Sequence, residues 1–90
     1  MLFDRALCRG ARAIAGLSQA ELAAAAGVGL STISQFEAGR RAPHPHNRDA
    51  IKRALAAIGV EFAEHPDGAA CIRLDPKRFY SLQTNEVLPE

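Results

Sequence analysis

The amino-acid sequence predicts a mainly α-helical domain of four helices, followed by a short β-hairpin. Apolar residues recur with the 3.6-residue period of helices up to residue 58, and a glycine follows each helical pattern. From residue 60 to residue 74 the period changes to two, which is typical of strands. The chain has 90 residues, of which 48% are hydrophobic, so it can bury one compact core and no second one.

The first two helices are predicted over residues 4–15 and 19–26. One face of the first helix carries Cys8, Ala11, Arg12 and Ala15, at i, i+3, i+4 and i+7 spacing. Ser18 and Glu21 form a capping box, in which each side chain accepts a hydrogen bond from the other residue's backbone N–H. The second helix therefore begins directly after Ser18, and Gly27 ends it because glycine adopts the left-handed conformation without strain.

The third helix is predicted from Leu30 to about Ala38, after a tight turn at Val28 and Gly29. Its inner face consists of Ile33, Phe36 and Glu37. Its outward side carries no charge and consists of one apolar residue and four polar ones: Leu30, Ser31, Thr32, Ser34 and Gln35.

Residues 40–46 are predicted to form an extended loop, because the residues that precede Pro43 and Pro45 avoid helical backbone. Asn47 is the predicted N-cap of a fourth helix that runs to Ile58. The apolar stripe of this helix consists of Ile51, Ala54, Leu55 and Ile58.

The hairpin is predicted over residues 60–74, with Val60, Phe62, Ile72 and Leu74 on one face. A two-stranded hairpin is marginally stable alone, so this face should pack on the helices or on a second copy of the chain. Residues 75–90 show no clear periodicity, which leaves Phe79 and Tyr80 without predicted partners. We therefore expect a helical unit at 1–58 and an extension at 59–90 for dimerisation or partner binding.

The charge of the chain is divided between these two segments. The whole chain carries +1, which excludes a binder that relies on bulk neutralisation of phosphates. Residues 1–58 hold eight basic and four acidic residues, a net charge of +4, and residues 59–90 hold three and six, a net charge of −3. This polarity indicates an anion-binding N-terminal part and a C-terminal part with a different task.

The segment 18–38 has the pattern of two short helices that cross at a steep angle through a tight turn. The outward side of the second helix suits the edges of DNA bases: Gln35 can bond adenine in two places, and Leu30 suits a thymine methyl group. Its N-terminus at Gly29 carries no capping side chain, which leaves backbone N–H groups open to a phosphate.

Residues 16–43, GLSQAELAAAAGVGLSTISQFEAGRRAP, resemble the Cro/cI-type (XRE-like) helix-turn-helix family of bacterial and phage transcriptional regulators. Residue type and spacing agree at about ten positions. The resemblance covers roughly residues 5–58 and implies a four-to-five-helix, λ-repressor-like DNA-binding domain. This chain departs from many relatives at Gly29, where they carry a capping Ser or Thr.

The resemblance implies three groups of functional residues. Leu30, Ser31, Thr32 and Gln35 would face base edges or the groove of double-stranded DNA, and Ser34 lies on the same predicted outward side, although these polar residues could also be an ordinary solvated face. Gln19, Arg40 and Arg41 would contact phosphates, to which the uncapped helix N-terminus at Gly29 adds its free N–H groups; otherwise Gln19 is a first-turn helix residue and the two arginines belong to a soluble loop. Arg12 and Glu37 would form an internal ion pair that orients the first helix against the third.

Other chemistry has weaker support in the sequence. No Ser/His/Asp set, carboxylate pair or phosphate-binding glycine loop is present, so we expect neither an enzyme nor a cofactor. His44, His46 and His65 do not match the spacing of a zinc site, so no metal is expected. Cys8 is expected in the core and Cys71 on the opposite face of the hairpin, with a redox switch between them a minor alternative.

The sequence therefore favours a sequence-specific transcriptional regulator, most simply a repressor or autoregulator that binds a palindromic operator as a homodimer. Its half-sites would lie about one turn of DNA apart, roughly 34 Å. No stretch approaches 18 apolar residues, so a cytoplasmic protein with no membrane span is expected. The alternative is an antitoxin or anti-activator that binds a protein partner through residues 59–90, with DNA binding secondary.

Overall fold

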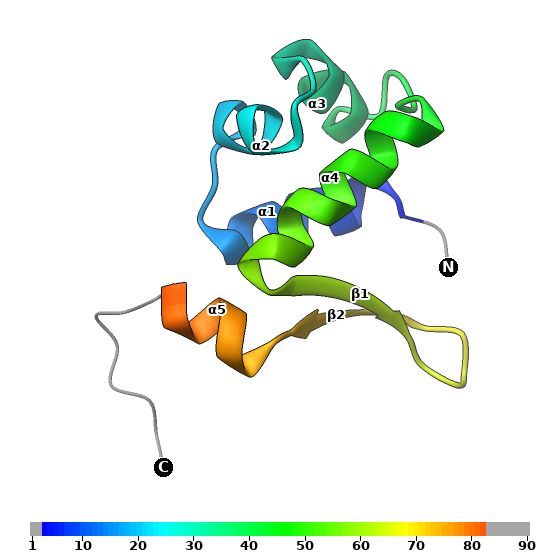
Figure 1. Ribbon diagram of the computed structural model, residues 1–90. Coiled ribbons are helices and arrows are strands. Elements are labelled where there is room, and N and C mark those ends of the chain that lie inside the picture. Colours follow the sequence, from blue (N-terminus) through cyan, green and yellow to red (C-terminus); the bar gives the residue numbers. More distant parts are fainter. Residues whose placement is uncertain (1–2, 83–90) are drawn as a thin grey trace.

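The structure is a computed structural model that describes residues 3–82 (Figure 1). Five helices and one hairpin follow in the order α1 (Arg5–Ala15), α2 (Gln19–Ala26), α3 (Leu30–Glu37), α4 (Pro45–Ile58), β1 (Val60–Glu64), β2 (Ala70–Leu74) and α5 (Pro76–Leu82). The predicted fold class, mainly helical with a hairpin after the first four helices, is confirmed. The predicted aperiodic segment 83–90 lies outside the described residues.

The first three helices begin and end as their sequence predicts. The capping box is present in full at the start of α2, where the Ser18 hydroxyl accepts from Glu21 N–H at 3.0 Å and the Glu21 carboxylate accepts from Ser18 N–H at 2.8 Å. These bonds with Ser18 lower the pKa of Glu21. Gly27 ends α2 with φ +70°, so the chain turns sharply into α3.

The start of α4 corrects the sequence prediction. The helix begins at Pro45 and its N-cap is His44, whose Nδ1 accepts from His46 N–H at 3.2 Å, so Asn47 is not the cap. Proline is compatible with the first helical position because its fixed φ suits a helix and the N–H it lacks would have no helical partner. The prediction weighed the avoidance of helix before proline, which applies to His44 and not to Pro45 itself.

The helix α5 is absent from the sequence prediction, which also makes the helix number five instead of four. Its start is fixed by Asp75, whose carboxylate accepts from the backbone N–H groups of Lys77 and Arg78. The Arg78 backbone and side-chain bonds lower the pKa of Asp75 to about 2. The helix places Phe79 in the core with 8% exposure and leaves Tyr80 edge-on against it, at 5.1 Å between ring centroids.

The hairpin is antiparallel, with Val60 opposite Leu74 and Phe62 opposite Ile72, as the alternation predicts. These four side chains pack on the helical core, and Val60 is fully buried there. Of the four residues expected to dimerise, Val60 has its side chain fully buried in the chain's own core, and dimerisation through this hairpin stays a prediction. Phe62, Ile72 and Leu74 are half-buried.

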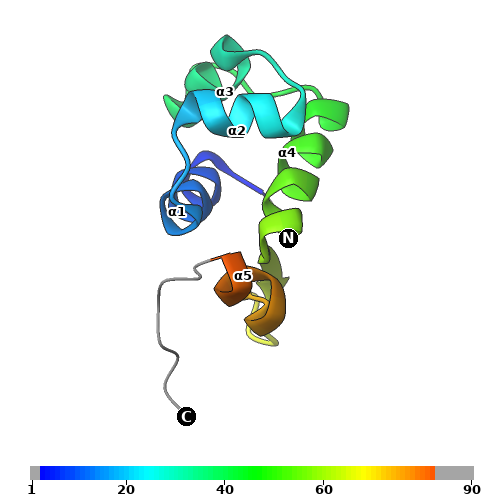
Figure 2. The same cartoon turned by 60° about the vertical axis from the view of Figure 1, so that its left-hand side comes forward.

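The molecule has two distinct ends, which both views show (Figures 1 and 2). The helices α2 and α3 lie at one end, the hairpin and α5 lie at the other, and α4 runs between them. One core connects both ends, because Leu22, Ile33 and Leu55 are buried together with Val60 and Phe79. The hairpin thus stabilises the domain that carries α2 and α3, while α3 faces away from it.

Candidate nucleic-acid interface

The helix α3 presents the uncharged side that its sequence predicts. Ile33, Phe36 and Glu37 are buried, whereas Leu30 is 51% exposed and Ser31 is also exposed. Thr32, Ser34 and Gln35 are half-buried, and the Ser34 hydroxyl donates to the Ser31 carbonyl oxygen at 3.3 Å. Leu30, Ser31, Thr32 and Gln35 therefore offer a free outer surface, and Ser34 satisfies its hydroxyl within the helix.

The N-terminus of α3 is open. Its N-cap Gly29 is extended and makes no side-chain capping bond, and a Cβ at this position would meet only the Thr32 and Ser31 hydroxyls, at 3.7 and 3.9 Å. Backbone N–H groups at the start of a helix carry partial positive charge and lack helical acceptors. An anion can approach this end closely.

A cavity of about 310 Å³ lies beside the outer side of α3. One wall is formed by Ser31, Thr32 and Gln35, and the other by the loop 41–44 and Asn47. His44 and Asn47 were not predicted as part of this surface. Their contribution follows from the early start of α4, because with His44 as the cap the Asn47 side chain is not engaged in capping.

Arg40 and Arg41 follow α3 directly and are exposed. Their backbone N–H groups donate to the Gln35 carbonyl oxygen, at 2.9 and 3.3 Å, which fixes the loop against the end of the helix. Both guanidinium groups thus lie on a loop held close to the residue predicted to read bases.

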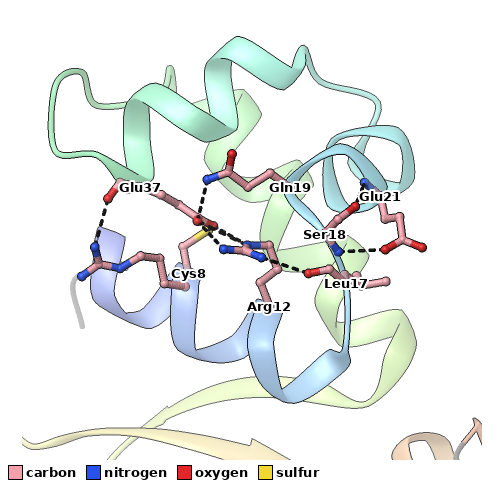
Figure 3. A network of polar contacts seen from close by, with 8 residues as sticks. Cys8, Arg12, Leu17, Ser18, Gln19, Glu21 and Glu37 are labelled. Carbon is pink, nitrogen blue, oxygen red and sulfur yellow. Dashed lines mark hydrogen bonds and ion pairs between the residues drawn. The ribbon is translucent and has the colours of Figure 1, made fainter.

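A buried carboxylate, Glu37, joins α1, α2 and α3 (Figure 3). Glu37 is 3% exposed and accepts from Arg12 Nη2 at 2.8 Å and from Arg12 Nε at 2.9 Å. The Gln19 amide donates to the same carboxylate at 3.1 Å, and the Cys8 thiol donates to it at 3.3 Å. Arg12 also donates to the Leu17 carbonyl oxygen at 3.0 Å, so it holds the α1–α2 connection as well.

The charges of this network follow from its contacts. Burial alone would raise the pKa of Glu37, but the hydrogen bonds from Arg12, Gln19 and Cys8 outweigh it and lower that pKa. The bond to Glu37 raises the pKa of Arg12. Burial, together with the neighbouring carboxylate, raises the pKa of Cys8 to about 12, so its thiol keeps its proton at neutral pH. The network is therefore an ion pair with two neutral donors.

Gln19 has a second task that sequence reasoning missed. One amide N–H is committed to Glu37, so the side chain is fixed at the first position of α2. An amide nitrogen has two hydrogens, and the other is left for an outside acceptor such as a phosphate. Glutamine at this place can connect the phosphate contact to the buried ion pair, which only the folded arrangement of α2 and α3 reveals.

Two more arginines of α1 meet the end of α3. Arg5 Nη1 donates to the Ala38 carbonyl oxygen and Arg9 Nη1 to that of Glu37, each at 3.4 Å. Cations near the last carbonyls of a helix are stabilising, because those oxygens carry partial negative charge. The spacing of Arg5, Arg9 and Arg12 along one side of α1 is the sequence signal that could have predicted this contact.

Among the remaining candidates, His44 lines the cavity beside the outer side of α3, and Cys8, Cys71 and His65 do not. Cys8 is fully buried and Cys71 is half-buried, and neither forms a disulfide. His44 and His65 accept from the backbone N–H groups of His46 and Asp67, each at 3.2 Å, which explains these rings as local turn-forming groups. Within residues 3–82, no three His, Cys, Asp or Glu side chains gather as metal ligands.

The fold and this surface define a helix-turn-helix protein, the class in which two short helices are joined by a tight turn and the second helix exposes its outer side. A family model described as a helix-turn-helix domain matches residues 5–66, which is more than half of the chain. The chain belongs to this helix-turn-helix domain family, and the match is consistent with the Cro/cI-type resemblance. The family suggests a DNA-binding regulator. No match to the chain was found among curated proteins.

The matched segment ends at residue 66 and so includes β1. Over the described part of the chain, no helix has both the length and the apolar character needed to cross a membrane.

Proposed function

We propose that this chain is a sequence-specific transcriptional regulator, a repressor or autoregulator of the bacterial or phage cytoplasm, that binds a palindromic operator as a homodimer. In this proposal α3 enters the major groove with Leu30, Ser31, Thr32 and Gln35 towards the base edges. Gln19, the N–H groups beyond Gly29, Arg40 and Arg41 hold the phosphates on either side.

The observation that carries the proposal is the uncharged outer side of α3, a helix whose inner face is buried in the core and which is followed by two arginines. A solvated helix face is usually rich in charged residues, whereas this one offers short donors and acceptors and one exposed leucine. Arg40 and Arg41 stand at its end, where the DNA backbone would pass. Base reading needs uncharged hydrogen-bonding groups, and positioning on DNA needs cations beside them.

Dimerisation is proposed because one short helix contacts too few base pairs to select a site in a genome. The hairpin has two strands, and within residues 3–82 neither strand pairs with a third. Pairing of one such edge with its copy across a two-fold axis would extend the sheet to four strands. The two α3 helices could then read two half-sites.

The proposal is tested by selecting bound sites from random duplex DNA. We expect a two-fold symmetric site whose half-sites are about one turn apart, roughly 34 Å. The double variant Ser31→Ala, Gln35→Ala should lose about tenfold or more in preference for this site over random DNA, because each good base contact is worth about 1–3 kcal/mol. Thermal unfolding of the variant establishes that it folds. A variant with undiminished preference would refute base reading by α3.

The phosphate contacts are tested in the same binding assay by varying salt. Arg40→Ala should weaken binding to all sequences alike and reduce the salt slope by about 0.9 for each protomer. Lys77→Ala is the matched control: it removes an exposed cation of α5, at the opposite end of the molecule, and should leave the slope unchanged.

The alternative antitoxin or anti-activator function gains no support from Glu61 of β1 or from Asp75, which directly precedes α5. Glu61 pairs with Arg73 at 2.6 Å and with Arg78 at 3.1 Å, and Asp75 pairs with Arg78 at 2.9 Å. These carboxylates are neutralised within the chain, so they are poor attractors for a basic partner. We therefore propose DNA binding as the primary function.

A further inference from the structure

We propose that a second cavity, between the start of α1, the end of α3 and the start of α4, binds a small amphipathic anion with an apolar body and a terminal carboxylate, and that this ligand weakens DNA binding. The cavity measures about 470 Å³, within the range of about 300–1,000 Å³ that is usual for small-molecule sites. It lies outside the predicted base-reading surface of α3.

The floor of this cavity is apolar and firmly held. Phe3 and Phe36 line it, their ring centroids are 5.7 Å apart, and both residues belong to the core. Ala42 and Pro43 of the loop before α4 complete the apolar wall. A hydrocarbon or aromatic body placed here gains free energy in proportion to the apolar area that leaves water.

The rim of the cavity is cationic. Arg5, Arg41 and Arg48 line it together with one carboxylate, that of Asp4, which already accepts from Leu7 N–H at 2.9 Å as the cap of α1. Within residues 3–82, the guanidinium groups of Arg41 and Arg48 make no hydrogen bond or ion pair. Three guanidinium groups against one engaged carboxylate favour an anion, and the planar guanidinium matches a carboxylate with two parallel bonds.

A small ligand fits these features better than a strand of DNA. A sugar–phosphate backbone would use the arginines but would gain nothing from a floor of two phenyl rings. An apolar carboxylate uses both parts of the cavity. The combination of an apolar floor with a few converging polar groups is the usual design of a small-molecule site.

The position of the cavity connects it to the DNA surface. Arg41, Ala42 and Pro43 line this cavity and also the cavity beside the outer side of α3. A bound carboxylate that pairs with Arg41 competes with the phosphate contact proposed for this residue. The regulatory part of the inference rests on the proposed function, and the ligand site itself does not.

Ligand binding is tested on the full chain alone, without DNA, by titration with hydrocinnamate while backbone amide NMR shifts are followed. We expect a dissociation constant of about 1 mM or tighter. The shifts should concentrate at residues 3–5, 36–43 and 48. Hydrocinnamamide lacks the charge and acetate lacks the apolar body, so each should bind at least about tenfold more weakly.

Arg48→Ala should weaken hydrocinnamate binding by about tenfold to a hundredfold, because a hydrogen bond to a charged group is lost. Arg53→Ala is the matched control, since Arg53 is an exposed arginine of the same helix that does not line this cavity. Equal binding of the acid and its amide, shifts spread over the whole surface, or equal effects of the two substitutions would overturn the proposal.

The regulatory part is tested by adding hydrocinnamate to the complex with the selected operator. We expect operator affinity to fall about fivefold or more at saturating ligand, and by linkage the operator should weaken ligand binding by the same factor. Unchanged affinity would overturn the regulatory part. If instead Arg48→Ala weakens operator binding and hydrocinnamate does not bind, the cavity binds the DNA backbone and the proposed ligand site is refuted. If no operator is selected but hydrocinnamate binds, the proposed function alone has failed.

Discussion

At the scale of single residues, Glu37 determines how α3 is held. The carboxylate is buried, yet it stays charged because Arg12 neutralises it and Gln19 and Cys8 supply further donors. A buried ion pair contributes little net stability compared with apolar packing, but removing one partner leaves a buried charge without compensation. The pair therefore acts mainly through the orientation it imposes on α1, α2 and α3.

The variant Glu37→Gln should lose about 2–3 kcal/mol of unfolding free energy, because it keeps the shape of the side chain and leaves Arg12 without its counter-charge. The measure is chemical denaturation at neutral pH. Glu21→Gln is the control: a glutamine at this position can still accept from Ser18 N–H, so stability should change by about 0.5 kcal/mol or less. Equal losses in the two variants would contradict this role of Glu37.

The stability of the wild-type chain should fall in acid, and part of the fall should come from Glu37. Its pKa is lowered in the folded state, so its contribution is complete above the ordinary value of 4.5 and is lost as the pH falls through the folded-state pKa. Asp75, with a pKa of about 2, acts in the same direction but is present in both proteins.

The difference in unfolding free energy between the wild type and Glu37→Gln should therefore shrink as the pH falls below the ordinary pKa of 4.5 and through the lowered folded-state pKa. Once protonated, Glu37 is as neutral as glutamine. A difference that stays constant over this range would mean that the charge of Glu37 is not what the substitution removes.

At the scale of elements, local signals predict most boundaries and tertiary contacts explain the errors. The Ser18–Glu21 box predicts the start of α2 because both of its bonds are local. The start of α4 is misplaced because two residues, His44 and Asn47, are both compatible with a cap and only the folded chain selects between them. The seven residues of α5 are too few for a helical period to be recognised.

The site shows the same division. The outer residues of α3 are predicted because periodicity alone separates them from Ile33 and Phe36. The bond from Gln19 to Glu37 joins residues 18 positions apart, and the cavities combine α1, α3 and α4. Such contacts depend on how the helices pack against one another, and local patterns in the sequence do not reveal that packing.

The junction between α4 and the hairpin provides a test at this scale. Gly59 has φ +94°, and a Cβ there would lie 2.5 Å from the Phe79 backbone nitrogen. Gly59→Ala should therefore suffer both backbone strain of about 1–2 kcal/mol and a steric clash of about 1–3 kcal/mol more.

Gly16→Ala is the matched control, since Gly16 has φ +73° and open space at its Cβ position. It should lose only the strain of about 1–2 kcal/mol. Unfolding free energies of the two variants measure the difference, and equal losses would show that α5 does not pack against this junction as described.

At the scale of the whole molecule, the surface proposed to read bases and the strands proposed to dimerise lie at opposite ends. The outer side of α3 lies at one end and the hairpin at the other, with one core between them (Figures 1 and 2). The inner face of the hairpin is already used by that core, which leaves the outer face and the edges of the sheet for other contacts. Two backbone hydrogen bonds fix the alternation of the ladder: Asp75 N–H donates to Gly59 O at one end, and His65 N–H donates to Ala69 O at the other.

Hydrogen-bonded pairs alternate along an antiparallel ladder, so the backbone groups of Glu64 and Ala70 point away from the partner strand. Proline at either position removes one outward N–H and no hydrogen bond of the β1–β2 ladder. Glu64→Pro tests the β1 edge and Ala70→Pro tests the β2 edge.

We expect the proline on the dimerising edge to weaken self-association by about tenfold or more in sedimentation measurements, through the loss of two symmetric hydrogen bonds. The proline on the other edge is its control, and thermal unfolding verifies that both variants fold. Normal self-association of both variants would contradict edge-to-edge dimerisation.

The convergence of Cys8, Arg12 and Gln19 on one carboxylate has a consequence for the variation of this family. Because each of these donors contributes to the charge balance and hydrogen bonding of Glu37, none of the four positions can change freely while the other three stay fixed. Positions 8, 12, 19 and 37 should therefore covary as one unit. Within residues 3–82, no hydrogen bond or ion pair joins the outer side chains of α3 to this group, so the proposed base-reading surface can vary without breaking its bonds.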